Sequence, residues 1–379
     1  MSDELALLDD TVQSILDRHL TREARAEAAT DLPAELWRVL DDSGLTSLAT
    51  PEGGGGLPEL IVLAWAVGRA AAPVPLVEMA GLASWLLTLG GLPLPDGITT
   101  CATADPRDAL RLTQHADGWS ASGVLHRVPW GAAAQQVVAL ADSDDGPHVV
   151  VLSSRTRLDP GRNHAGEPRD TLHLEDVVVP ASSAAPVDVT AGDLRRRGAL
   201  LRSASMAGAM EQVLAMTIAH AAGREQFGRP LSAFQAIQHH LVAIAEESVC
   251  TAMAVRAAAV SEAGSPGLSS TGLGSTGLGS AGLGAAAAKA TAGRAASVVT
   301  ARAHQVHGAI GTTQEHSLHW FTTRLWSWQD EFGSASHWAG QIGRDVLAGD
   351  PASLWPRISA SVGEQAVAGH GRPTLAGRS

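Results

Sequence analysis

Hydrophobic residues in the first hundred positions recur at the spacing of amphipathic helices. Near the start of the chain, one helical face collects Leu5, Leu8, Val12, Ile15 and Leu16. Two further helices are predicted at 35–43, ending near Gly44, and at 60–72. Residues 1–100 are therefore predicted to form an N-terminal helical domain.

The pattern changes between residues 101 and 190. Short runs that are β-branched, or that alternate apolar and polar residues, occur at 136–140, 148–152 and 171–179. Clusters of Asp, Gly and Pro separate these runs, as is typical of antiparallel strands. We expect a middle β-domain over residues 101–190.

Helical character returns over residues 191–360. A five-residue repeat built on Gly-Leu-Gly interrupts it within the low-complexity stretch 264–284, where the glycine content disfavours a helix. We therefore expect a C-terminal helical domain over 191–360 with a loop at 264–284, followed by a disordered tail over 361–379. The order helical, β, helical gives an α+β fold.

Charge and composition narrow the classes of function. The net charge of -12 at pH 7 argues against a nucleic-acid-binding protein, which would carry a basic face. The acidic N-terminus lacks a secretory signal pattern, and the longest apolar run, 79–95, is interrupted by Gly and Pro, so no membrane span is expected. Cys101 and Cys250 show no metal or disulfide spacing. We expect a cytoplasmic protein with no metal site.

The stretch 223–241, GREQFGRPLSAFQAIQHHL, holds the densest set of specific residues. A helix over 204–222 leads into Arg224-Glu-Gln226-Phe227-Gly. After a Gly-Arg-Pro turn, a second amphipathic helix follows, with apolar residues at helical spacing. The alternative, an ordinary helix-loop-helix, does not account for an arginine, an amide, an aromatic ring and a glycine within five residues.

Four segments in order resemble the acyl-CoA dehydrogenase family of flavoproteins. They are Gly44-Leu through Pro51-Glu and the glycines that follow, Val177-Val-Val-Pro180, Arg224-Glu-Gln-Phe-Gly with Phe234-Gln235, and Gln305-Val-His-Gly-Ala-Ile-Gly with the helix after it. The resemblance covers about residues 30–349. It implies a helical N-terminal domain, a middle antiparallel β-domain and a C-terminal four-helix bundle.

The same resemblance implies FAD as the cofactor. It assigns flavin contacts to Arg224, Gln226, Phe227 and Gln235, and, from the neighbouring subunit of a dimer, to Gln305, Val306, His307, Gly308 and Ala309. The physical chemistry agrees, because a guanidinium offers bidentate donors to a pyrophosphate and a glycine-rich turn lets backbone amides approach it. The family's Thr-Glu-Pro…Gly-Ser-Asp motif is missing from 103–113, so no flavin contact is predicted from the β-domain.

Besides the missing motif, the sequence differs from the family at the position of the catalytic base. Dehydrogenation needs a carboxylate that removes a proton from the acyl α-carbon while hydride passes from the β-carbon to flavin N5. The family's carboxylate position aligns with Gly333, and Glu331 and Asp330 lie two and three residues earlier. Other members place the base before the Arg-x-Gln-Phe motif, but 195–199 offers none and Glu211 is expected to face elsewhere. Glu331, Asp330 and no base in this chain remain open.

The resemblance thus predicts FAD-dependent α,β-dehydrogenation of an acyl thioester, carried by coenzyme A or by an acyl carrier protein. An electron-transfer flavoprotein is the expected electron acceptor. The assembly is expected to be a homodimer or homotetramer, or a heteromer in which a paralogous subunit carries the base. The remaining alternative is a non-catalytic helical scaffold of the same fold that has lost flavin.

Overall fold

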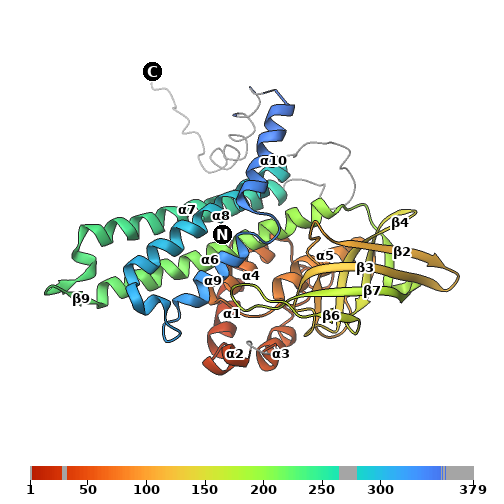
Figure 1. Ribbon diagram of the computed structural model, residues 1–379, viewed down its shortest axis with the longest axis horizontal. Helices are drawn as coiled ribbons and strands as arrows, with labels where there is room; N and C mark the ends of the chain where they lie inside the picture. Colours follow the sequence, from red (N-terminus) through yellow and green to blue (C-terminus); the bar gives the residue numbers. More distant parts are fainter. Residues whose placement is uncertain (1, 28–31, 264–279, 351, 353–354, 356–379) are drawn as a thin grey trace, which may run out of the picture.

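The computed structural model describes residues 2–27, 32–263, 280–350, 352 and 355. Figure 1 shows long helices gathered on one side of the molecule and a β-sheet on the other. The expected tail at 361–379 and residues 264–279 of the expected loop lie outside the described residues. Within the described ranges, no helix combines the length and the apolar character that crossing a membrane requires.

The N-terminal part is helical, as predicted. It contains α1 (Asp3–His19), α2 (Arg22–Glu27), α3 (Ala34–Asp42), α4 (Leu57–Ala70), the π-helical turn η1 (Val77–Ala83) and α5 (Ser84–Leu89). Ser2 caps α1 because its side-chain oxygen accepts a hydrogen bond from Leu5 N. Val12 and Leu16, from the predicted apolar face, are fully buried against the rest of the domain.

The middle part is a mostly antiparallel sheet with the order β6-β7-β3-β2-β4-β5-β8, and β1 pairs with β4 in parallel. Its strands are β1 (Thr99–Cys101), β2 (Ala109–His115), β3 (Gly118–Pro129), β4 (Gln136–Ser143), β5 (Gly146–Ser153), β6 (Arg157–Asp159), β7 (Arg169–Pro180) and β8 (Ala184–Pro186). The register between β3 and β7 shifts between Leu125 and Val128. This irregularity holds Arg127 in the left-handed region, at φ 54°.

The C-terminal part is a helical bundle followed by α10. Its elements are α6 (Ala191–Gly223), the short strands β9 (Glu225–Gln226) and β10 (Arg229–Pro230), the turn η3 (Leu231–Ala233), α7 (Gln235–Ala263), α8 (Ser280–His307), the turn η5 (Gly308–Thr312), α9 (Leu318–Trp328) and α10 (Ala335–Ala348). Thr190 and Asp193 form a reciprocal capping box that begins α6.

The expected loop at 264–284 is too long, because α8 begins at Ser280. Packing explains why the glycines near the start of α8 do not delay the beginning of the helix. A Cβ added at Gly284 would lie only 3.1 Å from the Cα of Ala258 on α7, so the missing side chain lets the two helices approach closely. Contact between α7 and α8 therefore outweighs the low helix propensity of glycine in this segment.

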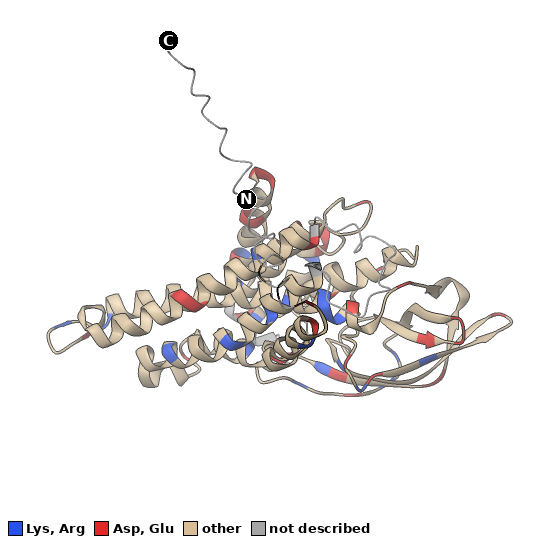
Figure 2. Ribbon diagram, turned by 90° about the horizontal axis from the view of Figure 1, so that it is seen from above, with Lys and Arg blue, Asp and Glu red and all other residues tan. Residues whose placement is uncertain are grey.

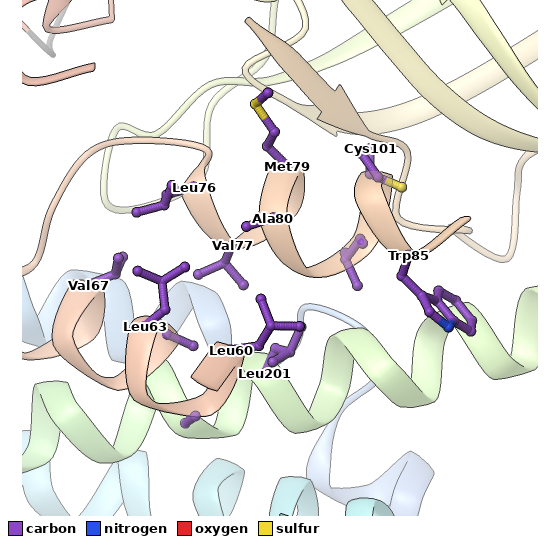
Figure 3. Close-up of a cluster of buried hydrophobic side chains, with 14 of the residues drawn as sticks. Leu60, Leu63, Val67, Leu76, Val77, Met79, Ala80, Trp85, Cys101 and Leu201 are labelled. Atoms are coloured by element: carbon purple, nitrogen blue, oxygen red, sulfur yellow. The ribbon is translucent and has the colours of Figure 1, made fainter. Parts of the chain in front are cut away.

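The main hydrophobic core joins the N-terminal helices to α6. Figure 3 shows Leu60 and Leu63 of α4 facing the η1 turn, with Leu201 of α6 beside them. Close backbone contact locks α4 onto α6, since a Cβ at Gly68 would lie 1.9 Å from Ser205 O and one at Gly208 would lie 2.1 Å from Trp65 O. The helix α6 is thereby a fixed axis that runs from the sheet to the far end of the bundle (Figure 1).

Candidate functional site

The segment Asp330–Ser334, where the sequence places the candidate bases, lines a cavity of about 350 Å³. We call this cavity the junction pocket, because its walls come from the sheet, the start of α6 and the segment between α9 and α10. Its lining residues are Thr103, Ala104, Asp105, Pro106, Arg127, Arg169, Arg195, Asp330, Glu331, Phe332, Gly333, Ser334 and His337. Figure 2 shows basic and acidic residues meeting in this region between the helices and the sheet.

Glu331 is buried in a double ion pair. Its Oε1 accepts a hydrogen bond from Nε of Arg169 at 2.8 Å, and its Oε2 lies 3.1 Å from Nε of Arg202. Only 7 % of its side chain is exposed. Asn163 Nδ2 donates a further hydrogen bond to Oε1 at 3.3 Å. Both carboxylate oxygens therefore already face cationic groups of the same chain.

These contacts belong to a wider network of buried charges. Arg202 Nη2 donates to Glu78 at 2.6 Å, and Arg324 Nε donates to Glu167 at 3.0 Å. Glu167 also accepts from Nη2 of Arg169 at 3.2 Å. The network joins η1 of the N-terminal part, the segment leading into β7, α6 and α9, so it holds all three parts of the fold together at the junction pocket.

The surrounding charges set the protonation state of Glu331. Burial by itself raises the pKa of this carboxyl, but the charges of Arg169 and Arg202 outweigh burial and hold the pKa below its ordinary value. The pKa of Glu167 is lowered in the same way, to about 2, because Arg324, Arg169 and Arg202 outweigh its burial. A carboxylate whose charged form is stabilised this strongly is a poor proton acceptor.

Asp330 differs from Glu331 in exposure and in pairing. Its side chain is exposed and lines the junction pocket, and it forms no ion pair with the residues that the structure describes. Of the two carboxylates that the sequence singled out, Asp330 is the one open to a ligand in this pocket.

The middle part of the fold contributes a wall of the junction pocket that no sequence motif predicted. Thr103 and Pro106 line the junction pocket, although 103–113 lacks the family's flavin motif. Asp105 is held by Arg107 through Nε–Oδ1 and Nη2–Oδ2 hydrogen bonds of 2.8 and 2.9 Å. The hydrogen bonds from Arg107 lower the pKa of Asp105. No motif in the sequence points to this wall, because its position depends on the way β1 pairs with β4.

Lys289 on α8 supports the segment that carries both candidate bases. Its Nζ is fully buried and donates to the carbonyl oxygens of Trp328 and Gln329 at 3.0 and 2.7 Å. The last carbonyls of a helix have no partner within it, so Lys289 satisfies the end of α9 immediately before Asp330. Burial lowers the pKa of Lys289 to about 7, although Glu331 opposes this shift.

We expect Lys289 to make stability depend on pH between about 7 and 10.5, its folded and ordinary pKa values. In that window the unfolded chain binds a proton that the folded chain releases, so the contribution of Lys289 to the free energy of unfolding rises with pH. Urea unfolding of the native chain and of Lys289→Met at several pH values gives the difference between their free energies of unfolding. We expect this difference to shift in favour of the native chain as pH rises. Arg38→Met, on the surface of α3, is the control; a pH-independent difference for Lys289→Met contradicts the prediction.

The residues that the resemblance assigns to FAD lie at the other end of the bundle. Arg224 follows the last turn of α6 and is exposed, as are Gln226 and, at the start of α7, Gln235. Phe227 is 93 % exposed and has a left-handed backbone, with its ring edge-on to Phe234 at 6.1 Å.

The second predicted group, at the end of α8, divides into two sets. Gln305, Gly308 and Ala309 are exposed, and Gly308 has φ 63° with open space around its Cα. Val306 and His307 are buried, with 4 % and 5 % of their surface exposed. Their side chains therefore pack into the bundle, and only their backbone can reach a ligand outside it.

The exposed residues at this end of the bundle have the chemistry that suits a pyrophosphate-containing cofactor. Arg224 offers an accessible fork of donors for a pyrophosphate, and Gly308 leaves room for close approach to its backbone. Along α6, Arg224 lies about 33 Å from Arg202 at the junction pocket, at 1.5 Å per residue. The residues at the two ends of α6 therefore face different ligand positions within one chain.

Comparison with known proteins gives consistent results. Residues 196–331 match the family model described as acyl-CoA dehydrogenase, C-terminal domain. The acyl-CoA dehydrogenase IpdE2 of Mycolicibacterium smegmatis is 28% identical over 345 residues, which cover 86% of this chain and 93% of that protein. The structure of the ChsE4-ChsE5 complex from Mycobacterium tuberculosis has a TM-score of 0.81 and 25% identity, covering 93% of this chain and 99% of that one. A steroid ACAD described as Tcur3481-Tcur3483 has a TM-score of 0.77 and 26% identity, covering 92% and 98%.

Proposed function

Because this chain is related to the acyl-CoA dehydrogenases in sequence and fold, we propose that it is a subunit of a heteromeric, FAD-dependent acyl-CoA dehydrogenase. The assembly introduces a 2,3-double bond into an acyl thioester of coenzyme A or of an acyl carrier protein, and an electron-transfer flavoprotein accepts the electrons. In this arrangement the present chain holds part of the flavin, and a paralogous subunit supplies the catalytic base.

One observation carries this proposal: Glu331 is buried and paired with both Arg169 and Arg202. To act as a base it would have to give up its charge beside Arg169 and Arg202, which would leave the buried network of arginines and glutamates with one uncompensated positive charge, and that is costly. The positions 195–199 on α6, where other members carry the base, hold no carboxylate. One of the similar solved structures is described as the ChsE4-ChsE5 complex, and another carries the paired name Tcur3481-Tcur3483.

The roles of the residues follow from their positions. FAD would supply the acceptor for the hydride of the acyl β-carbon. Arg224 would hold its pyrophosphate through charge-assisted hydrogen bonds, and Gln305 and the backbone of Gly308 would contact the cofactor from the adjoining chain. The buried charge network fixes the wall of the junction pocket at Asp330–Ser334. It holds Glu331 in its ion pairs, so that this carboxylate does not remove a proton from the substrate.

A second candidate function is a homo-oligomeric dehydrogenase with Asp330 as its base, because Asp330 is exposed and lines the junction pocket. In that case the chain carries its own base and works as a homo-oligomer. Asp330→Asn then abolishes turnover while leaving the bound flavin unchanged, whereas in the heteromeric assembly the same substitution leaves turnover near its original value.

Co-expression with a paralogous subunit, compared with expression alone, tests the proposal. We expect flavin absorbance near 450 nm and acyl thioester oxidation from the co-purified assembly, and no turnover from this chain by itself. An artificial electron acceptor makes the assay independent of the natural acceptor. Full turnover by the isolated chain overturns the heteromer, and a colourless assembly that cannot be reconstituted with FAD favours the non-catalytic scaffold.

A further inference from the structure

Three histidines from separate parts of the chain meet at the end of the bundle that lies away from the sheet. They are His220 on α6, His307 at the end of α8, and His316 between η5 and α9. One ring nitrogen from each lies within 4.8 Å of the others. The rings of His220 and His307 are stacked with centroids 4.4 Å apart, and His316 meets His307 edge-on at 4.8 Å.

The backbone orients His307 for use as a ligand. Its Nδ1 lies 2.9 Å from the carbonyl oxygen of Ala303, so this nitrogen carries the proton and donates it. The lone pair is thereby left on Nε2. That atom is buried and has no hydrogen-bond partner, in a side chain that is 5 % exposed. A buried acceptor without a partner implies a group that fills the space beside it.

Imidazole binds metals in its neutral form. Burial lowers the pKa of His307 to about 4, with a smaller contribution from the other histidines. Burial also lowers the pKa of His220, as do His316 and the nearby charge of Arg224.

We propose that His220, His307 and His316 bind one divalent transition-metal ion, with Zn²⁺ the best match. Three imidazoles with a fourth position left open are an established zinc donor set, and imidazole suits zinc among the available metals. At a Zn–N distance of about 2.1 Å the nitrogens of a tetrahedral site lie about 3.4 Å apart. The nitrogens of the present cluster, within 4.8 Å of one another, would have to approach by up to about 1.4 Å to reach that size.

One existing contact changes on binding. The backbone N–H of Leu318 donates to Nδ1 of His316 at 3.1 Å, so an ion that takes this nitrogen replaces a single neutral hydrogen bond. In return, the ion ties together α6, α8 and the segment before α9. Because Arg224 and Gly308 lie beside these histidines in the chain, the metal fixes the two exposed loops relative to each other. This effect on the two loops does not depend on whether the chain takes part in dehydrogenation.

Metal titration of the full chain, stripped with a chelator and dialysed, tests the site. We expect one Zn²⁺ per chain by calorimetry, and a visible spectrum typical of low coordination number with Co²⁺. His307→Gln and His220→Gln each weaken binding by at least about ten-fold, since even the loss of a group behind a ligand has that effect. His173→Gln is the matched control, because that ring pairs with Asp159 on the sheet at 2.8 Å and should leave binding unchanged.

Two results overturn the proposal. One is the absence of saturable binding by the unmodified chain at micromolar metal, and the other is unchanged affinity in both cluster variants. Far-UV circular dichroism checks that the variants fold. If they do not, X-ray absorption of the Zn²⁺-loaded unmodified chain decides the matter: three imidazole ligands support the site, and any smaller number rejects it.

Discussion

Replacing Glu331 with Gln is expected to lower the free energy of unfolding by about 3 kcal/mol, the scale on which breaking one partner of a buried ion pair destabilises a protein. The amide oxygen can still accept a hydrogen bond from Arg169, but the negative charge beside Arg169 and Arg202 is gone, and the buried network is left with one positive charge in excess. Denaturant unfolding followed by tryptophan fluorescence measures the change. Because the pKa of Glu331 is held below its ordinary value, the stability that it contributes is present near neutral pH and is lost as pH falls through that lowered pKa.

The neighbouring Asp330→Asn is the matched control, since it removes the same charge from an exposed side chain of the same segment. Its effect is expected to stay within about 0.5 kcal/mol. The pattern that would contradict our interpretation is the reverse: a Glu331→Gln variant as stable as the native chain, in an assembly whose turnover has fallen by orders of magnitude. Glu331 would then be the base, and its pairing with the arginines would be a resting arrangement.

Substituting Arg224 with Ala is expected to weaken FAD retention by about thirty-fold, which corresponds to about 2 kcal/mol for hydrogen bonds between charged groups. The guanidinium is exposed at the end of α6, so its removal should cost little stability and act on the cofactor alone. Arg224→Lys should recover only part of the affinity, because an ammonium keeps the charge but loses the bidentate fork. Flavin absorbance per protein after gel filtration, followed by titration with FAD, gives both quantities.

Arg229→Ala provides the control within the same turn. Its guanidinium stacks on Phe234, with Cζ 4.0 Å from the ring centroid, so the substitution removes an equal charge that already has a partner in the chain. Equal losses of FAD in the Arg224 and Arg229 variants would indicate general electrostatic attraction rather than a specific contact. Undiminished FAD content in Arg224→Ala would remove the assignment altogether.

Much of the fold could be predicted from local patterns. The apolar spacing at Val12 and Leu16 identified a buried helical face, and the alternating runs in 101–190 identified a sheet that is mostly antiparallel. The expected loop at 264–284 was wrong at its end, since α8 already begins at Ser280. There, close packing of Gly284 against Ala258 decided the outcome, and propensity carries no information about such a contact.

For the candidate site, too, some features could be predicted from the sequence and others depended on the tertiary structure. The sequence by itself predicted the resemblance to acyl-CoA dehydrogenases and singled out Arg224, because the motifs that carry the resemblance consist of residues adjacent in the chain. Only the tertiary structure decided the state of Glu331, because its partner Arg169 lies 162 positions away in the chain. It also decided that His307 turns inward to meet His220 and His316. Ion pairs and clusters of histidines depend on distances in space between residues that are far apart in the chain. The order of residues along the chain does not give those distances directly.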